Sequence, residues 1–587
     1  MPLVKLDHVS KSYGANLILN DVCWQISAND RVGLVGDNGT GKTTLFNIIV
    51  GETVRYKGTV ECAKRARIGY LRQEPEFDSQ MKLRDAIRMT AFGHMHDLEH
   101  EMELLAAKMG QMDAGEDPTE IMDKYARLQE KHEAHGGYGY EHRLDSVLGG
   151  LGFTQADFQL PVKALSGGQK GRAALACLLL EEPDLLLLDE PVNHLDLAGT
   201  EWLEGFLTNE YHGSVVVISH DRYFLDKVVT KVVELQNHRL EEYGGNYTKY
   251  LFLKERKILV QQRQYERQQE EIAHDEDFIR RYKAGQRTKE ARGREKKLNR
   301  MELVEKPQLQ TKRIKLNFST DLRGGDDVLQ LRSVNKRYGD KVLFENLSLD
   351  IYRGDRVGII GPNGIGKTTL LRMILGQEQP TSGTVKVGHN LRVGYYDQEH
   401  EGLNLENTVL EELWELLPGK TQGEVRSYLG RFLFSGDEVF KSVYDLSGGE
   451  QSRIALSKLL LENGNFLILD EPTNHLDIGS KEVLEESLME YPATMIIVSH
   501  DRYFLDKIVN KILFMEEDKA WLWTGNYTEY GEWKLEKKAE EEAKAAAERK
   551  KAAEEKKRRA TQEQRRNSAA TKKKKKKKKT PKRWIGV

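Results

Sequence analysis

The sequence predicts an α/β fold made of two repeated domains in tandem, joined by a long helical linker and followed by a basic tail. A chain of 587 residues is too long for one hydrophobic core, so two or more domains are expected. Several short phrases occur twice, which indicates one unit written twice. In each copy an apolar run, RVGLV or RVGII, precedes a Gly-rich turn and a helix-forming segment, as in a parallel sheet covered by helices.

The two copies match phrase by phrase, and the matches reveal one insertion. Up to Gln73 and Gln398 the offset is a constant 325 residues, and after them it is 281 or 280. The first copy therefore carries 44 more residues in this interval, and two amphipathic segments predict a helical hairpin at 94–140. The matching phrases are KSYG and KRYG (11–14, 336–339), GDNGTGKTTL and GPNGIGKTTL (36–45, 361–370), LSGGQ and LSGGE (165–169, 446–450), and SHDRYFLDK twice (219–227, 499–507).

The linker is predicted to be a pair of helices with a basic bend. Its Gln-, Glu- and Arg-rich segments indicate helices at 250–282 and 289–304, and residues 279–315 hold 14 Lys and Arg against 4 Glu. A solvated helix face would show the same spacing, but a bend of this charge is well placed to touch phosphates. The predicted parts are the first repeat (1–245), the linker (246–326), the second repeat (327–533) and the tail (534–587).

The tail gives the chain a strong charge asymmetry. Residues 534–587 hold 23 Lys and Arg against 8 Asp and Glu, so the tail carries +15 while the rest of the chain carries −17. The Lys/Glu/Ala-rich part is expected to be helical when ordered, and the eight lysines at 572–579 are expected to be disordered. A basic tail on an acidic body favours contact with a polyanion over a purely solubilising role.

Composition narrows the class of protein. The chain has no run near the ~18 apolar residues that cross a membrane, and its N-terminus lacks a signal pattern. Three scattered cysteines, Cys23, Cys62 and Cys177, argue against a disulfide framework or a zinc site. A cytoplasmic protein is therefore expected.

Each repeat contains a phosphate-binding loop. GDNGTGKT and GPNGIGKT fit the pattern G-x-x-x-x-G-K-[ST], and each lies between an apolar strand and an apolar helix, as a P-loop requires. Backbone N–H groups of such a loop surround phosphate oxygens at a helix N-terminus. Lys42 and Lys367 should reach the β- and γ-phosphates of a nucleotide, and Thr43 and Thr368 should hold Mg²⁺.

Two neighbouring acids end a buried strand in each repeat. LLLLDE and FLILDE are four apolar residues followed by Asp-Glu, and a buried parallel strand delivers such carboxylates to the edge of the sheet where ligands bind. Asp189 and Asp470 are predicted to bind Mg²⁺, directly or through water. Glu190 and Glu471 are predicted to orient the attacking water or accept its proton.

LSGGQ and LSGGE, placed before these strands, resemble the signature of ATP-binding-cassette ATPases, and the resemblance covers nearly all of residues 1–530. It implies that each repeat is a P-loop ABC ATPase domain with a helical subdomain, and that two domains sandwich two ATP molecules head to tail. Each P-loop would then face the signature of the other repeat. The implied first site pairs Lys42, Gln73, Glu190 and His220 with Ser447 and Gly449, and the second pairs Lys367, Gln398, Glu471 and His500 with Ser166 and Gly168.

The resemblance also assigns individual roles. Gln73 and Gln398 are similar to glutamines that sense Mg²⁺ and the water, His220 and His500 to switch histidines on the γ-phosphate, and Tyr13 and Tyr338 to the aromatic that stacks on adenine. The remaining predicted nucleotide-binding residues are Gly36, Asn38, Gly39, Gly41, Thr44, Gly361, Asn363, Gly364, Gly366 and Thr369 in the P-loops, and Gly167 and Gly448 in the signatures.

The whole arrangement resembles the ABC-F family. The Asn-His-Leu-Asp phrases, the tandem repeats, the basic helical linker and the hairpin in the first repeat carry this resemblance. It implies a monomeric, ATP-switched translation factor that binds the ribosome. The bend at 280–300 would contact tRNA or rRNA near the tRNA exit site, and the 94–140 hairpin would contact the ribosome nearby.

Other functions stay open on the sequence alone. One alternative is an ATPase that works with a separate membrane partner. Another is an ATPase that acts on branched DNA or structured RNA in repair and binds the nucleic acid through its basic tail. A scaffold with vestigial hydrolysis is disfavoured, because the Lys, Glu and His are intact in both copies. Antibiotic resistance by ribosome protection ranks below a general factor, because the linker is not obviously extended.

The phrase DEPVNHLD departs from DEPTNHLD at one residue. Val192 stands where the second repeat has Thr473, so any hydrogen bond of that hydroxyl is lost in the first copy. Both carboxylates remain, so the first site is expected to be active with a rate different from the second. The resemblance implies that Asp196 lies where the two domains exchange contacts.

Overall fold

The protein is described from a computed structural model. The described residues are 2–71, 80–110, 119–134, 139–282, 287–304, 306, 324–339, 341–397, 402–474, 476–516, 519–537, 539, 540 and 544. They fall into two compact units, Met1–Leu522 and Trp523–Val587. Gln73, Gln398, His475, the hairpin turn at 113–118 and the tail from 545 onward, all singled out by the sequence, lie outside the described residues.

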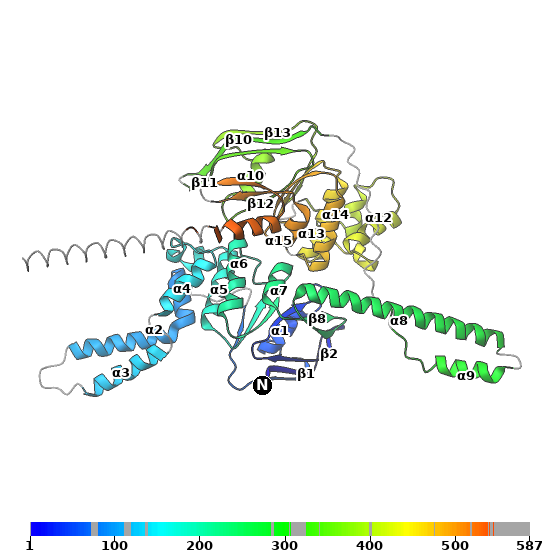
Figure 1. Ribbon diagram of the computed structural model, residues 1–587, viewed down its shortest axis with the longest axis horizontal. Helices are drawn as coiled ribbons and strands as arrows, with labels where there is room; N and C mark the ends of the chain where they lie inside the picture. Colours follow the sequence, from blue (N-terminus) through cyan, green and yellow to red (C-terminus); the bar gives the residue numbers. More distant parts are fainter. Residues whose placement is uncertain are drawn as a thin grey trace, which may run out of the picture. The chain divides into compact units, whose positions relative to one another are not determined.

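The first repeat contains a six-stranded sheet and a three-stranded antiparallel sheet (Figure 1). The six strands run in the order β5-β6-β7-β3-β8-β9, parallel except for the β8–β9 pair. The small sheet has the order β2-β1-β4. The strands are β1 (Pro2–Tyr13), β2 (Asn16–Ser27), β3 (Arg31–Val35), β4 (Lys57–Cys62), β5 (Ile68–Tyr70), β6 (Leu185–Asp189), β7 (Ser214–Ile218), β8 (Lys231–Gln236) and β9 (Arg239–Gly244).

Strand β6 shows why this sheet forms in the interior. All four leucines are fully buried, and alternate residues of a strand point to opposite faces. Leu186 and Leu188 pack in the core made with helices α5 and α7, whereas Leu185 and Leu187 pack with α1 and the small sheet. The strand therefore needs apolar residues at every position, and its first polar side chains come at its carboxyl end.

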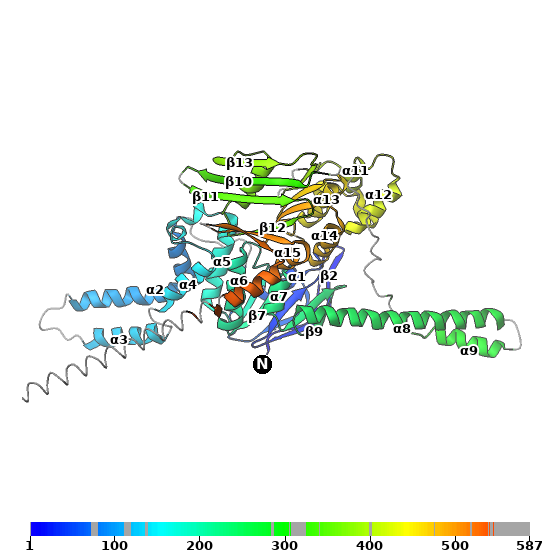
Figure 2. The same ribbon diagram turned by 45° about the horizontal axis from the view of Figure 1, so that its top comes forward.

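The helices of the first repeat include the predicted hairpin. Figures 1 and 2 both show α2 and α3 as an antiparallel pair that projects from the sheet. His132 and Tyr140 both bond to Glu99 at its base, at 3.1 and 2.9 Å. The helices are α1 (Lys42–Val50), α2 (Leu83–Gly110), α3 (Thr119–Ala134), α4 (Gly139–Gly150), α5 (Gly167–Glu181), α6 (Leu197–Gly205) and α7 (Arg222–Val228), with short turns η1 (Asp157–Gln159), η2 (Val162–Ala164) and η3 (Phe206–Glu210).

The linker contains two helices, as predicted, with a shorter second helix. Helix α8 spans Tyr247–Tyr282, and α9 spans Thr288–Leu298 rather than reaching Val304. The side-chain amide of Gln268 on α8 explains the early end. It donates to the carbonyl of Glu302 (2.7 Å) and accepts from the N–H of Val304 (2.8 Å), so these residues lie extended along α8.

The second repeat has the same two sheets, with the same relative strand positions. Their orders are β14-β15-β16-β12-β17-β18 and β11-β10-β13. The strands are β10 (Asp327–Tyr338), β11 (Lys341–Tyr352), β12 (Arg356–Ile360), β13 (Ser382–Val387), β14 (Val393–Tyr396), β15 (Phe466–Asp470), β16 (Thr494–Val498), β17 (Lys511–Met515) and β18 (Ala520–Thr524). The helices are α10 (Lys367–Ile374), α11 (Val409–Trp414), α12 (Gln422–Leu429), α13 (Gly448–Leu461), α14 (Ile478–Glu490) and α15 (Arg502–Ile508), with η4 (Gly430–Phe432), η5 (Gly436–Phe440) and η6 (Val443–Asp445).

The C-terminal unit is described only in its first part. Residues 527–537 are helical, and an aromatic cluster supports this turn of chain. The ring of Trp533 lies 5.2 Å from Trp523 and 5.9 Å from Tyr530, measured between centroids. Among the described residues of the chain, every helix is too short or too polar to cross a membrane.

Candidate functional site

Each P-loop is shaped to receive an anion. Helices α1 and α10 begin at Lys42 and Lys367, and the glycine before each has a φ of 104°, a conformation that side chains rarely adopt. Neither helix has a side-chain cap, so the N–H groups of its first turn are available to a ligand. Gly39 and Gly364 lie in the preceding turns, and Thr44 and Thr369 lie in the first helical turns.

The P-loop lysines are held inside their own loops. Lys42 donates from Nζ to the carbonyls of Gly36 (2.7 Å) and Asp37 (2.9 Å). Lys367 donates in the same way to Gly361 (2.7 Å) and Pro362 (3.2 Å). Burial lowers the pKa of both ammonium groups. Each lysine therefore sits at the loop as a poorly solvated cation, which favours exchange of these carbonyls for phosphate oxygens.

A threonine and an aspartate meet at each predicted metal position. The hydroxyl of Thr43 donates to Asp189 (2.8 Å), and Thr368 bonds to Asp470 in the second repeat. Burial raises the pKa of both aspartates despite these bonds. Hydroxyl and carboxylate oxygens are the ligands that Mg²⁺ prefers, and a divalent cation would offset the cost of burying the charge. These residues therefore fit a magnesium ion.

The glutamate after each aspartate lies beside the histidine of its own repeat. Glu190 accepts a bond from the N–H of His220 at 3.3 Å, and its other oxygen lies 3.5 Å from Nε2 of that ring. Glu471 and His500 repeat this geometry at 3.4 and 3.6 Å. Burial raises the pKa of both glutamates to about 8 and lowers the pKa of both histidines to about 3.

Polar atoms without a partner mark where a ligand belongs. Among the described side chains, Oε1 of Glu190 and Glu471 and Nδ1 of His220 and His500 are buried and lack a hydrogen bond. Leaving such atoms unpaired costs about 1–3 kcal/mol each, so a polar ligand that reaches them is stabilised. Their repetition in both repeats fits two sites for a hydrated nucleotide.

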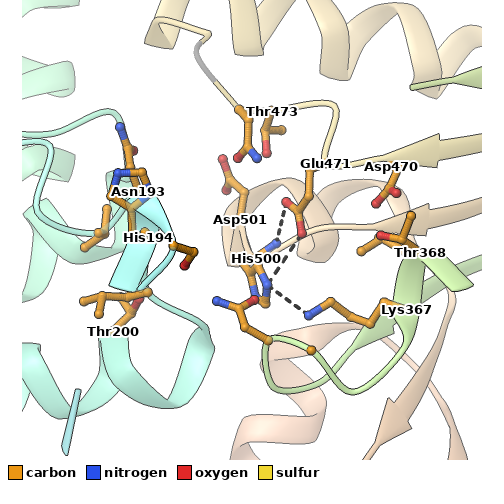
Figure 3. A pocket seen from close by; sticks show the side chains of 18 of the residues that line it. Asn193, His194, Thr200, Lys367, Thr368, Asp470, Glu471, Thr473, His500 and Asp501 are labelled. Atoms are coloured by element: carbon orange, nitrogen blue, oxygen red, sulfur yellow. Dashed lines mark hydrogen bonds and ion pairs between the residues drawn. The ribbon is translucent and has the colours of Figure 1, made fainter. Parts of the chain in front are cut away.

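A cavity of about 800 Å³ lies between the two repeats and contains most of the second predicted site. Figure 3 shows Asn193, His194 and Thr200 on one side and Lys367, Glu471 and His500 on the other. Nζ of Lys367 lies 3.3 Å from Nε2 of His500. The predicted residues in the lining are Ser166, Gly168, Tyr338, Asn363, Gly364, Gly366, Lys367, Thr368, Thr369, Asp470, Glu471 and His500, with Asn38, Glu190 and His220 of the first site.

The remaining predicted residues of the first site do not line this cavity. Among the described residues that line it, Lys42, Ser447 and Gly449 are absent. Ser447 begins α13 as a capping residue, with Glu450 accepting from its N–H at 2.8 Å. Ser166 begins α5 in the same manner with Gln169. The glycines Gly167, Gly168, Gly448 and Gly449 form the first turns of these helices.

The two predicted adenine-stacking residues are half exposed. Tyr13 and Tyr338 are 52% and 51% exposed, although large aromatic rings usually bury more of their surface. A lysine covers each ring, Lys11 at 4.5 Å and Lys336 at 4.9 Å from the ring centroid. Their exposed rings leave room for a base to stack.

The Asn-His-Leu-Asp phrases contact the opposite repeat. Asp196 caps helix α6 through the N–H of Gly199 (2.9 Å), while its second oxygen lies 3.5 Å from the N–H of Asn363 in the other P-loop. Asp477 makes the reciprocal contact with Asn38, also at 3.5 Å. The expectation that Asp196 lies where the repeats exchange contacts is confirmed. Each P-loop therefore receives a carboxylate from the other repeat.

Val192 lacks the hydrogen bond that its counterpart makes. Thr473 is buried, and its hydroxyl lies 3.2 Å from the hydroxyl of Ser499. Val192 packs instead against the apolar core of the first repeat. The expected loss of one hydrogen bond is confirmed at this position.

Several charged residues of this interface were not predicted from the sequence. Arg222 pairs with Glu485, and Arg502 pairs with Glu204, each across the two repeats. Repetition in the sequence could have revealed these pairs. Both arginines belong to the repeated phrase SHDRYFLDK, and Glu204 and Glu485 stand 281 residues apart, at matching positions of the two repeats. Lys481 also crosses the interface, but its position differs between the copies, so repetition could not reveal it.

Two P-loops, two strand-end Asp-Glu pairs and two signature helices, joined by reciprocal contacts, define a tandem ATP-binding-cassette ATPase, an enzyme that hydrolyses ATP. The model of the family described as "ABC transporter" matches residues 19–193 and 344–474. A second family model with the same description, which covers an extension of the domain, matches residues 233–318. The chain belongs to the ABC-F family, whose tandem cassettes and linker account for the fold described above.

Curated relatives match along most of the chain. The putative ATP-binding protein YdiF of Bacillus subtilis is 42% identical over 92% of this chain and 84% of its own length. ABC transporter F family member 5 of Arabidopsis thaliana is 38% identical over 92% and 78%. The energy-dependent translational throttle protein EttA of Escherichia coli K12 is 38% identical over 88% and 93%.

Solved structures confirm the fold. The RNase-L inhibitor aligns with a TM-score of 0.56 at 19% identity, over 89% of this chain and 91% of its own. The archaeal ribosome recycling factor aABCE1, in complex with the stalk protein aP1, aligns with a TM-score of 0.54 at 19% identity, over 86% and 87%. At this identity the likeness concerns the tandem-cassette fold.

Proposed function

We propose that this ATPase is a translation factor that binds the ribosome while its repeats are closed on ATP and leaves after hydrolysis. The observation that carries the proposal is the 38% identity with the translational throttle protein, which extends over 88% of this chain. The match therefore includes the linker as well as the cassettes. Geometry supports the switch, because residues of the two repeats meet around a cavity that also contains the predicted catalytic residues.

ATP is proposed to bind with Mg²⁺ at two composite sites. Thr43 and Asp189 would hold the ion at the first site and Thr368 and Asp470 at the second, with Gln73 and Gln398 as the further predicted ligands. The bound ion would neutralise charge on the phosphates. Lys42 and Lys367 bind the β- and γ-phosphates, Tyr13 and Tyr338 stack on adenine, and the signature serines and glycines of the opposite repeat complete each site.

The chain's own residues prepare the water for attack. Glu190 and Glu471 are positioned to orient a water and to accept its proton, which requires the ionised carboxylate. His220 and His500 are neutral at physiological pH, because burial lowers the pKa of both to about 3. Each imidazole therefore acts as a hydrogen-bonding group rather than a cation, and its free Nδ1 can donate to or accept from a ligand.

The linker is proposed to supply the contact with RNA. Around the bend, among the described residues from 280 to 300, the exposed basic side chains are Arg280, Arg281, Arg287, Lys289, Arg292, Lys296, Lys297 and Arg300. A helix pair with this charge suits a phosphate backbone, and tRNA or rRNA near the tRNA exit site is the proposed partner. The 94–140 hairpin is proposed as a second ribosomal contact and the 534–587 tail as an additional one. The protein would act as a monomer in the cytoplasm.

The trapping experiment uses the variant Glu190→Gln/Glu471→Gln. With both carboxylates removed, ATP should close the repeats without hydrolysis, so the variant should co-sediment with ribosomes in cell extract and inhibit translation. Wild-type protein with ATP, and the variant with ADP, should remain mostly in the ribosome-free fractions. A variant that stays free of ribosomes with ATP present would contradict the proposal.

A second candidate is an ATPase that acts on nucleic-acid structures in repair. The basic linker surface favours it to the same degree, because charge alone does not distinguish a ribosome from branched DNA. Stimulation of ATP hydrolysis by ribosomes and by four-way DNA junctions, compared at one salt concentration, separates the two. A third use, protection of the ribosome from antibiotics, would show as lower drug susceptibility of cells that express the protein.

A further inference from the structure

Lys481 extends from the second repeat into the catalytic loop of the first. It lies in the first turn of α14, and its side chain is almost fully buried. The ammonium group donates to the carbonyl of His220 (3.0 Å) and to the carboxylate of Asp501 (2.8 Å). His220 adjoins Glu190, so a buried cation of one repeat holds the backbone of the predicted switch histidine in the other.

At the position equivalent to Lys481, the first repeat offers the second site a neutral residue. Lys481 follows Asp477 by four residues, and the residue in the same position after Asp196 is Thr200. The hydroxyl of Thr200 donates to the carbonyl of Asp196 (3.0 Å) within its own helix. Thr200 lies in the lining of the cavity, on the side opposite His500 in Figure 3, and its side chain is neutral and short. The two sites therefore differ in a charge-assisted bond across the interface.

The electrostatic surroundings of the two catalytic glutamates follow this difference. Burial is the main influence on the pKa of Glu190, and Lys481 is the largest influence that opposes it. For Glu471 the largest opposing influence is Lys367, which belongs to its own P-loop. The charge of Lys481 thus acts on Glu190 together with that of Lys42, whereas for Glu471 the main opposing charge is that of Lys367.

We infer that Lys481 is a positioning residue supplied in trans, which fixes the His220 loop beside Glu190 when the repeats close and makes hydrolysis at the first site depend on closure more strongly than at the second. The inference rests on the proposed catalytic residues and not on the ribosome as partner. ATP turnover of the purified protein therefore tests it separately from the trapping experiment.

The experiment measures one site at a time. In the Glu471→Gln background the remaining turnover reports the first site, and in the Glu190→Gln background it reports the second. Lys481→Met should lower kcat at the first site about tenfold with KM changed less than twofold, because a bond to a charged group positions the loop rather than the nucleotide. At the second site the loss of kcat should be clearly smaller, because Lys481 reaches that site only through Asp501, the residue after His500. Lys481→Arg should recover most of the lost kcat.

Two controls separate positioning from other causes. Lys481→Met removes the cation that pairs with Asp501, whose carboxylate still accepts from the N–H of Phe504. Lys481→Met/Asp501→Asn therefore removes the remaining charge as well and should remain impaired at the first site. Lys511→Met removes a lysine that pairs with Asp355 (2.7 Å) at the amino ends of the strands, away from the site, and should leave turnover unchanged.

Three results would overturn the inference. The first is an unchanged kcat at the first site, and the second is an equal loss at both sites, which indicates a general defect of closure. The third is full recovery in Lys481→Met/Asp501→Asn, which makes Asp501 the cause. If either single Glu→Gln background retains the full wild-type turnover, the proposed catalytic assignments fail instead, and that failure is visible before Lys481 is changed.

Discussion

Glu190 and Glu471 are held in a backbone conformation that few residues other than glycine adopt. Their φ angles are 50° and 49°, immediately after the buried strands β6 and β15. Such a conformation costs about 1 kcal/mol or more and persists only where surrounding structure enforces it. The same conformation occurs in both repeats, where each carboxylate lies beside its histidine, as the proposed role of the pair in hydrolysis requires.

The two buried glutamates should make the protein less stable as the pH rises. Their pKa is raised from 4.5 to about 8, so between these values the folded protein keeps protons that the unfolded chain has lost. Stability is therefore lost from about pH 4.5 to pH 8. Glu190→Gln/Glu471→Gln does not titrate, so its Tm advantage over wild type should grow by at least about 3 °C between pH 5 and 8, without nucleotide.

Glu424→Gln is the matched control for this measurement. Hydrogen bonds from Thr421 and Lys420 lower the pKa of Glu424 to about 2, the opposite direction. The ionised carboxylate of Glu424 stabilises the fold above pH 4.5, and this stabilisation is lost only as the pH falls toward 2. The difference in Tm between Glu424→Gln and wild type should therefore be constant from pH 5 to 8. If the Tm difference between Glu190→Gln/Glu471→Gln and wild type is also constant from pH 5 to 8, the carboxyl groups of Glu190 and Glu471 are not protonated in the folded protein over this range, and the prediction is wrong.

At the scale of elements, the linker helices are joined by a buried ion pair. Asp275 on α8 is buried, and Arg294 on α9 donates to it at 2.6 Å. The guanidinium of Arg294 also lies 4.0 Å from the ring centroid of Phe278. Such a pair positions the basic face of α9 on α8, so it determines which side of the linker is presented to a polyanion.

Asp275→Asn should loosen α9 from α8. The change leaves the partly buried Arg294 without its carboxylate, which costs about 1–3 kcal/mol where a group is desolvated. Amide hydrogen exchange of Thr288–Leu298 should accelerate about tenfold or more, while the start of α8 keeps its protection. Arg280→Met removes an exposed pair with Asp277 within α8 and should change the exchange of α9 little. Equal protection of α9 in wild type and Asp275→Asn would contradict this role.

The sequence predicted those elements whose residues act locally. The P-loops, the leucine strands and the hairpin follow from glycine placement and apolar periodicity, and the structure contains all three, although α2 of the hairpin begins at Leu83, before the predicted start at 94. The end of α9 could not be predicted, because Gln268, more than thirty residues earlier, holds the extended segment. Lys481 could not be predicted either, because its contacts arise only when two segments far apart in the sequence meet across the interface.

At the scale of the molecule, two reciprocal ion pairs join the repeats near the sites. Arg222 reaches Glu485 while stacking on Tyr503 at 4.0 Å, and Arg502 reaches Glu204 while stacking on Tyr223 at 4.8 Å. Both arginines are buried. Because a buried charge without a partner is strongly unfavourable, the pairs disfavour partly closed arrangements that would leave one of these charges buried and unpaired.

A charge swap tests the Arg222–Glu485 pair. In the Glu190→Gln/Glu471→Gln background with ATP, Glu485→Arg should prevent closure, because it places two cations together. The radius of gyration from X-ray scattering should then stay near the value without nucleotide. Arg222→Glu/Glu485→Arg restores opposite charges and should recover at least part of the contraction. Full contraction of the single variant would show that this pair does not govern closure.

The reciprocal contacts of Asp196 and Asp477 also bear on how the gene can change. Each aspartate touches a loop encoded far away in the same reading frame, so neither half of the coding sequence specifies all the contacts of its own P-loop. A mutation that inactivates one repeat should therefore not be complemented by the intact repeat expressed as a separate protein. Complementation would require the separate repeat to displace the mutant repeat, which is covalently linked to its partner. Selection therefore acts on the two repeats together. A difference such as Thr200 in the first repeat and Lys481 at the same position of the second changes how the two sites compare, and it affects both repeats.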